Sequence, residues 1–244
     1  MHSCYVPPTE ISSDTIRIGQ PERHHLVNVL RLEPGEDVQI FDGEGNSYTV
    51  RLTDIDSPFA TASIHDRQFY PPIPPHITLF QAIPKSDKMD LIVQKATEIG
   101  VDEIVPMICQ RSIPKRAAAV QEKRRDRWQR IAVEASKQCK RPRFAKLLAT
   151  RKVEKCLKKA QNLDLSLFLW ENEEERGIKK ILRSHRQVES IGLFIGPEGG
   201  FSEEEVKDAV QSGCIPTTFG QSILRTETAA IVAVALAVYE LRSP

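Results

Sequence analysis

The first 70 residues combine short apolar runs with frequent turn signals, a pattern typical of a small β-rich module. Apolar or alternating runs at residues 15–18, 38–41, 47–52 and 60–69 predict strands. The sequence DGEG at 42–45 favours a turn between the second and third of these, which are therefore expected to form a hairpin. Residues 21–32 predict a short helix that begins at Pro21 and ends before Pro34.

From residue 76 onward, apolar strands alternate with helices. Strands are predicted at residues 76–82, 102–109, 165–171, 190–196 and 217–220. Helices are predicted at 87–99, 118–140, 173–184 and 226–241, and after Ser202, where Glu205 completes a capping box. This alternation predicts an α/β fold with a mainly parallel sheet covered on both faces. Four prolines within residues 71–75 indicate a stiff linker between domains at residues 1–72 and 73–244.

The charges are distributed unevenly along the chain, and the net charge does not reveal this. The 244 residues carry 34 Lys+Arg and 33 Asp+Glu, a net charge of +1 that gives no sign of a polyanionic partner. Residues 111–160, however, hold 18 Lys+Arg and four acids, a net of +14, whereas the remaining 194 residues hold 16 and 29, a net of −13. A solvated helical face is the ordinary explanation of a basic run, but this excess favours a surface that binds phosphate groups. Trp128 lies among these cations, and its helical spacing with Ile131 and Ala135 favours core packing over stacking on a base.

Cysteine usage and hydropathy narrow the class of protein. The five cysteines are odd in number, widely spaced and without a CxxC pair, which disfavours a disulfide framework, and no metal site is predicted. The first ten residues lack the basic and apolar regions of a signal peptide. The most apolar run, residues 229–239, is shorter than the about 20 residues that span a bilayer. We therefore expect a cytoplasmic protein without membrane contact.

Two glycine-containing loops follow predicted strands and lead into helices. The first is IGPEGGFSEEE at residues 195–205, where Gly196, Gly199 and Gly200 permit positive φ and close approach of a ligand. Amides at the helix start favour an anionic or hydrogen-bond-accepting group. The loop matches neither GxGxxG nor GxxxxGK[ST], and a single such loop is often only a tight turn. A second loop of the same kind at residues 219–225 favours a ligand site at the ends of the strands.

Arg225 stands at the entrance of the final helix. A buried or half-buried arginine there requires an anionic partner. Arg225 either pairs with Glu198 or Glu227 as a structural tie or contacts a substrate, and the residue chemistry leaves both readings open. The helix itself is apolar almost all round over residues 229–238, so it is expected to be buried in the core or against another subunit.

Several stretches, in the right order, carry a resemblance to a known family. GPEGGFSEEE at 196–205 followed by LRTETAA at 224–230, together with residues 24–45, 88–107 and 134–141, is similar to the RsmE family of ribosomal RNA methyltransferases. These enzymes methylate N3 of a uridine in small-subunit (16S-type) rRNA and belong to the SPOUT, or α/β-knot, class. The resemblance covers nearly the whole chain. It implies a C-terminal SPOUT domain with a deep trefoil knot, a small N-terminal PUA-like β-barrel domain that binds RNA, and a homodimer with its site at the interface.

The resemblance also implies where the cofactor lies. In this family the knot loops hold S-adenosyl-L-methionine (SAM) in a bent shape, which places Ile195, Ile223 and Leu224 beside the adenine. Carried over by position, the cofactor-binding residues are Leu169, Trp170, Ile195, Gly196, Pro197, Glu198, Gly199, Gly200, Phe219, Gly220, Ser222, Ile223, Leu224 and Arg225.

Methyl transfer to N3 requires loss of the N3 proton. Arg225 is the candidate that stabilises the anionic base, and Glu198 or Glu227 is the candidate that accepts the proton or orients Arg225. The basic segment and the N-terminal module supply the candidate contacts to RNA phosphates. These are His24, His25, Arg31, Arg111, Arg124, Arg127, Lys137, Gln138, Lys140, Arg141 and Arg143, with Lys115 and Arg116 between them in the chain.

Other functions stay open at this point. Another SPOUT enzyme would methylate tRNA or a ribose 2′-hydroxyl, and analysis of the product distinguishes it. A non-catalytic RNA-binding assembly factor would not bind SAM. An NAD-type enzyme is disfavoured because no glycine fingerprint follows the strand at residues 76–82.

Overall fold

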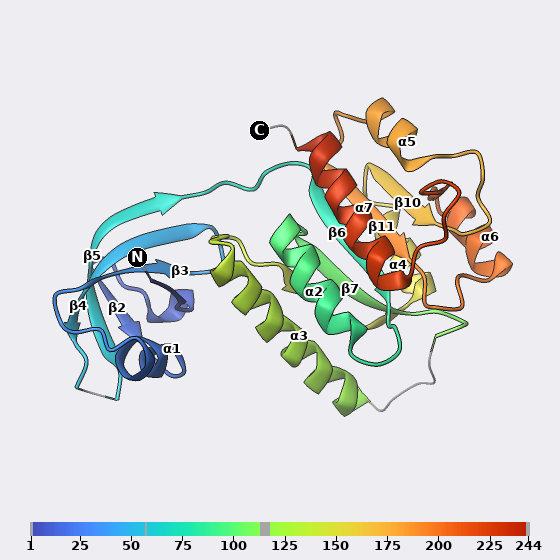
Figure 1. Cartoon of the computed structure of the whole chain (residues 1–244). Coiled ribbons are helices and arrows are strands. Elements are labelled where there is room, and N and C mark those ends of the chain that lie inside the picture. The colour runs from blue at the N-terminus through green and yellow to red at the C-terminus, as the bar shows by residue number, and fades with distance from the viewer. Residues whose placement is uncertain (1, 57, 113–117, 243–244) are drawn as a thin grey trace. The chain divides into compact units, whose positions relative to one another are not determined.

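The computed structural model describes residues 2–56, 58–112 and 118–242, and the chain divides into two compact units (Figure 1). The first unit comprises Met1–Pro72 together with Ser136–Phe144, and the second comprises Ile73–Ala135 and Ala145–Pro244. A segment of the basic region thus belongs to the same unit as the N-terminal residues. Within the described ranges, no helix is long and apolar enough to cross a membrane.

The first unit is built on a five-stranded sheet with the order β1-β3-β4-β5-β2. The strands are β1 (Ser3–Tyr5), β2 (Thr15–Ile18), β3 (Asp37–Phe41), β4 (Asn46–Asp54) and β5 (Ala60–Phe69). β1 pairs with β3 in parallel and the other pairs are antiparallel. The predicted hairpin is confirmed, since Val38 lies opposite Val50 across β3 and β4. Alternate residues of these strands form the core of the unit because side chains in a strand point to opposite faces.

Short helical segments complete the first unit. They are the 3-10 turn η1 (Pro8–Glu10), α1 (Glu22–His24) and the π-helical turn η2 (His25–Val29). The helix predicted from Pro21 therefore exists, but it is shorter and ends in the wider π turn. Leu26, which is fully buried, attaches it to the core of the sheet.

The second unit contains a parallel sheet with the order β12-β10-β11-β6-β7-β8, and β9 also pairs with β7. Its strands are β6 (His76–Ala82), β7 (Glu103–Ile108), β8 (Lys146–Leu147), β9 (Arg151–Lys152), β10 (Leu165–Leu169), β11 (Ser190–Ile195) and β12 (Ile215–Thr217). Its helices are α2 (Lys88–Ile99), α3 (Ala118–Gln138), α4 (Val153–Ala160), α5 (Ile178–Ser184), α6 (Glu203–Gln211) and α7 (Thr226–Leu241), with the last turn of α3 in the first unit. The mainly parallel α/β domain predicted from the alternating pattern is confirmed.

Helices cover both faces of this sheet because its strands present apolar side chains on both sides. Leu79, Leu167 and Leu193 pack in one core with buried residues of α2, α3, α5 and α7. Phe80 and Phe194, one residue further along their strands, point to the face covered by α4 and α6, where their rings stack with centroids 4.2 Å apart. Trp128 of α3 is 3% exposed and belongs to the first of these cores, as its helical spacing predicts.

Several segments differ from the sequence predictions; the short strands β1, β8 and β9 were not predicted, and three larger differences follow. The strand predicted at residues 217–220 is wrong: β12 occupies Ile215–Thr217 and includes Pro216, which an edge strand tolerates. The helix predicted from residue 173 begins only at Ile178, because the Glu173 carboxylate accepts hydrogen bonds from the next backbone amides and forms a turn. Helix α4 was not predicted, although Val153, Cys156, Leu157 and Ala160 have the helical i, i+3, i+4, i+7 spacing and are buried.

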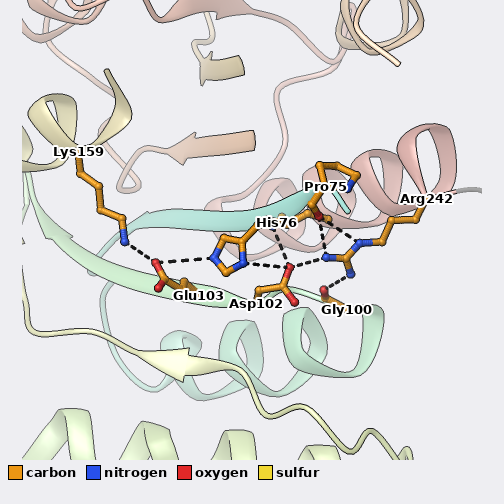
Figure 2. A network of polar contacts seen from close by, with 8 residues as sticks. Pro75, His76, Gly100, Asp102, Glu103, Lys159 and Arg242 are labelled. Atoms are coloured by element: carbon orange, nitrogen blue, oxygen red, sulfur yellow. Dashed lines mark hydrogen bonds and ion pairs between the residues drawn. The ribbon is translucent and has the colours of Figure 1, made fainter. Parts of the chain in front are cut away.

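Arg242, at the end of α7, forms hydrogen bonds with the segments that precede β6 and β7 (Figure 2). Its guanidinium donates to the carbonyl oxygens of Pro75, at 2.8 Å, and Gly100, at 2.7 Å, and it pairs with the carboxylate of Asp102. The side chain is only 10% exposed, so these partners compensate for most of its lost hydration.

His76 lies between two carboxylates in the same network (Figure 2). Its Nε2 is 4.0 Å from Oε2 of Glu103, and its Nδ1 is 3.9 Å from Oδ2 of Asp102. The contact with His76 and the pairing with Lys159 outweigh burial and lower the pKa of Glu103 to about 2. This network lies at the end of the strands opposite to the loops that follow β10 and β11.

Candidate active site

A cavity of about 600 Å³ opens where β10, β11 and β12 end. Parallel strands place their carboxyl ends at the same edge of the sheet, so the loops that follow them meet there. All fourteen residues predicted to bind a cofactor line this cavity: Leu169, Trp170, Ile195, Gly196, Pro197, Glu198, Gly199, Gly200, Phe219, Gly220, Ser222, Ile223, Leu224 and Arg225. The structure therefore brings together three segments that are about 20 to 55 residues apart in the sequence.

Seven further residues line the cavity but were not among the predicted cofactor-binding residues. They are Lys88, Glu171, Thr217, Thr218, Gln221, Thr226 and Ala229. Most are neighbours of predicted residues in the same loops. Lys88 is different, because it comes from the start of α2, far away in sequence, and no local pattern marks it.

Gly200 is required by the shape of the cavity wall. Its φ is +67°, a conformation that side-chain-bearing residues rarely adopt. A Cβ at this position would also lie 1.7 Å from Oε1 of Glu171. Glycine therefore lets the carboxylate of Glu171 lie directly against the backbone of the loop.

The loop at residues 196–200 is tied to two other elements by a buried polar chain. The Thr226 hydroxyl donates to the carbonyl oxygen of Gly196 at 2.6 Å. Gln81, fully buried in β6, donates from its amide to the Thr226 hydroxyl at 3.1 Å and to the carbonyl oxygen of Ala82 at 2.8 Å. The end of β11, the end of β6 and the start of α7 are thus held in one arrangement.

The predicted capping box of α6 is confirmed and extends beyond the helix. The Glu205 side chain accepts from the backbone amide of Ser202 at 2.9 Å, and its other oxygen accepts from the amide of Gln110 at 2.7 Å. Beside this contact, Arg111 donates to the carbonyl oxygen of Gly199 at 2.9 Å. Arg111, predicted to contact RNA, therefore lies against the wall of the cavity.

Lys88 bridges the two carboxylates that sequence analysis singled out. Its Nζ is 3.2 Å from Oε1 of Glu198 and 3.1 Å from Oε2 of Glu227. Glu198 Oε1 also accepts from the backbone amide of Lys85 at 3.0 Å. Burial alone would raise the pKa of each carboxyl, but backbone hydrogen bonds and Lys88 lower both pKa values overall. Glu227 is paired with the ammonium that lines the cavity, although it is not itself part of the lining.

Arg225 precedes α7 and is exposed, so the burial that would make an anionic partner necessary does not apply to it. Because water reaches the guanidinium, no desolvation cost obliges it to pair. Within the described residues, the ion pairs of Glu198 and Glu227 are made with Lys88 and not with Arg225. Arg225 is therefore an exposed cation in the lining of the cavity.

Comparison with known proteins also assigns the N-terminal residues and the rest of the chain to two different domains. A sequence model of the RNA methyltransferase domain matches residues 71–238, and one of the RNA methyltransferase PUA domain matches residues 18–64. Ribosomal RNA small subunit methyltransferase E of Synechocystis sp. is 30% identical over 94% of this chain and 75% of its own length. The chain belongs to the ribosomal RNA small subunit methyltransferase E family.

Solved structures agree with this family across the whole chain. Ribosomal RNA small subunit methyltransferase E from Neisseria gonorrhoeae, solved with bound S-adenosyl methionine, is 32% identical with a TM-score of 0.83 and covers 98% of this chain and 97% of its own. A Legionella pneumophila methyltransferase solved with the cofactor SAM is 28% identical, with a TM-score of 0.86 and coverage of 97% and 96%. The chain is thus an rRNA methyltransferase of this family, with the family's PUA and methyltransferase domains.

Most of the residues predicted to contact RNA belong to the first unit. They are His24, His25, Arg31, Lys137, Gln138, Lys140, Arg141 and Arg143. The turn after β3 holds residues 142–144 in place: the amide of Gly45 donates to the carbonyl oxygen of Pro142 at 3.1 Å, and that of Phe144 to the carbonyl oxygen of Gly43 at 3.0 Å. The basic segment that follows α3 is thereby joined to the N-terminal module.

The predicted RNA-contact residues of the first unit are not equally accessible to a bound RNA. His24, His25, Arg31, Gln138 and Lys140 are exposed. Lys137 instead forms an ion pair of 2.7 Å with Glu22, and both side chains are largely buried. Arg143 donates to the carbonyl oxygen of Tyr70 at 3.2 Å. Lys137 therefore has a structural partner, which sequence reasoning had no means to identify.

The other predicted RNA contacts lie in the second unit. Arg127 of α3 is exposed and pairs with Asp90, and Arg124 lies over the Trp128 ring, 5.1 Å from its centroid. Lys115 and Arg116 lie outside the described residues.

Proposed function

We propose that this enzyme transfers a methyl group from SAM to N3 of a uridine in small-subunit (16S) ribosomal RNA. The observation that carries the proposal is the cavity at the carboxyl end of the sheet, which collects all fourteen predicted cofactor residues. Relatives that match nearly the whole chain and bear the name of this methyltransferase support the substrate class.

The residues of the cavity fit SAM. Its volume of about 600 Å³ is within the range of small-molecule sites. Leu169, Ile195 and Leu224 provide apolar walls for the adenine, and the glycine loop exposes backbone groups to its edge and to the ribose. Glu171 adds a carboxylate that accepts hydrogen bonds from hydroxyl groups.

When bound, SAM supplies a methyl group already activated on a sulfonium. The chain's own residues must then hold the uridine in line with that methyl group and favour the anionic form of N3. Arg225 is the residue assigned to the second task, because its exposed guanidinium is a fixed positive charge at the cavity.

Glu198 and Glu227 are our candidates for accepting the N3 proton or for orienting a cation. Their lowered pKa values make them weak proton acceptors at neutral pH. Their contacts with Lys88 favour the second role. Arg225 therefore carries the main electrostatic contribution in the proposed mechanism, and the N3 proton passes to water.

The RNA is held by the exposed cations of the first unit and by α3. Neutralised phosphates release counterions, so affinity should fall as the salt concentration rises. A ribosomal RNA substrate supports a cytoplasmic location for the enzyme.

We also propose that the enzyme is a homodimer. Ile223 at the cavity is 81% exposed and Tyr239 on α7 is 80% exposed, both large apolar side chains. Val232 and Ala235, on the same face of α7 as Tyr239, are half-buried. A second copy packed on this face would cover these side chains and complete the site.

Two measurements test the proposed function. Calorimetry should detect SAM binding by the full chain, and a chain without SAM binding would instead be an RNA-binding assembly factor. Mass spectrometry of nucleosides from 16S rRNA treated with enzyme and SAM should show N3-methyluridine. A 2′-O-methyl nucleoside, or methylation of tRNA alone, would assign the enzyme to a different reaction.

A further inference from the structure

Lys88 occupies a position where elementary electrostatics disfavours a lysine. It is the first residue of α2. The amino end of a helix carries a partial positive charge, so a cation there is unfavourable unless other groups compensate for it. The reason for a lysine at this place must therefore come from outside its own helix.

The compensating groups come from two other elements. Glu198 lies in the loop after β11, and Glu227 lies in the first turn of α7. The ammonium contacts both carboxylates at 3.2 and 3.1 Å, and the three side chains are 32%, 26% and 14% exposed in the order Lys88, Glu198 and Glu227. One ammonium group thus joins the starts of two helices to the loop that forms the cavity wall.

We propose that Lys88 is a positioning residue of the cofactor cavity, which holds Glu198, and with it residues 196–200, against the start of α7. The inference rests on the proposed function, because the cavity is taken to bind SAM. Two ionised carboxylates that share one site repel each other when no cation lies between them. Removing the ammonium therefore drives Glu198 away from Glu227 and displaces the loop that carries it.

The neighbouring groups do not replace Lys88. The backbone amide of Lys85 donates to Glu198 but carries no net charge. Arg225 makes the smallest of the contributions that lower the pKa of Glu227. Without Lys88, protonation of one carboxyl relieves the repulsion without displacing the loop. The affinity of such a variant for SAM should therefore improve as the pH falls.

The test is calorimetric titration of the full-length enzyme with SAM at pH 7.5 and pH 5.5. Lys88→Met should weaken binding about tenfold at pH 7.5, the effect of one lost hydrogen bond between charged groups. The deficit should shrink at pH 5.5, and Lys88→Arg should restore most of the affinity. Lys95→Met is the matched control: it removes the same charge from the same helix, where Lys95 pairs with Glu98 at 2.8 Å, and it should bind like the wild type.

A second variant distinguishes repulsion between Glu198 and Glu227 from a general loss of folding as the cause of weaker SAM binding. Adding Glu198→Gln to Lys88→Met removes one of the two repelling charges, so the double variant should bind SAM more tightly than Lys88→Met alone. If Lys88→Met binds within twofold of the wild type at both pH values, or if its deficit does not depend on pH, the inference is overturned while the proposed function stands. A wild-type chain that does not bind SAM overturns both.

Discussion

Replacing Gly200 by alanine adds a single methyl group at the wall of the cavity, and its two effects can be worked out separately. The backbone effect follows from the φ of +67°, since an alanine in this left-handed conformation costs about 1–2 kcal/mol. The steric effect follows from the 1.7 Å between the new Cβ and Oε1 of Glu171. Ordinary contact begins at 3.4 Å, so the carboxylate must move away by about 1.7 Å.

Gly213→Ala is the matched control, because Gly213 has a φ of +84° and no atom within 4 Å of the added Cβ. It imposes the backbone effect without touching the cavity. Both variants should lower Tm by about 2–4 °C for each kcal/mol of strain. Only Gly200→Ala should weaken SAM binding, by about tenfold or more, since a hydrogen bond to a charged group contributes about 1.5–3 kcal/mol.

The assay is calorimetric titration with SAM beside a thermal melt of each variant. If Gly200→Ala and Gly213→Ala bind SAM with equal affinity, the carboxylate of Glu171 plays no part in the site. If Gly213→Ala loses affinity as well, the backbone strain and not the cavity wall explains the result, and the reasoning is refuted.

Three further predictions concern charged groups. Arg225→Ala should abolish methylation and leave SAM binding largely intact, and wild-type turnover in an rRNA methylation assay would exclude its catalytic role. Arg242→Ala should destabilise the fold by about 2–4 kcal/mol, because largely buried acceptors lose their donor; an unchanged thermal melt would contradict this. Glu103→Gln should be less stable than the wild type at pH 7. Because folding lowers the pKa of Glu103 from 4.5 to about 2, the stabilisation is present above pH 4.5 and should disappear as the pH falls towards 2; a stability difference independent of pH in chemical denaturation would argue against it.

The sequence was sufficient for elements whose ends carry their own signals. β6 and α7 have the bounds that the pattern predicts, and the capping box of Ser202 and Glu205 lies where expected. Weak or atypical signals explain the failures: Pro216 concealed β12, and the lysines of α4 obscured its buried spacing.

The position of the cavity was also predictable in part. Loops that follow strands of a parallel sheet meet at one edge, so the pattern alone indicated a ligand site at residues 195–200 and 219–225. The nature of the cofactor and the contribution of Leu169 and Trp170 came from the family resemblance. Contacts between distant segments were not predictable, because no local pattern encodes them. The bridge from Lys88 to Glu198 and the pair of Lys137 with Glu22 are of this kind.

The role of Arg225 was also left open by the sequence, because its exposure depends on how the loops pack around the cavity. The structure shows it to be exposed in the cavity lining. An exposed guanidinium agrees with the proposed contact with a substrate.

The most direct test of the central claim is mass spectrometry of 16S rRNA nucleosides from a strain that lacks this protein, with and without the gene restored. We predict that N3-methyluridine disappears from the 16S rRNA of the deletion strain. It should return with the wild-type gene and not with the Arg225→Ala gene. Unchanged N3-methyluridine in the deletion strain would contradict the proposed reaction.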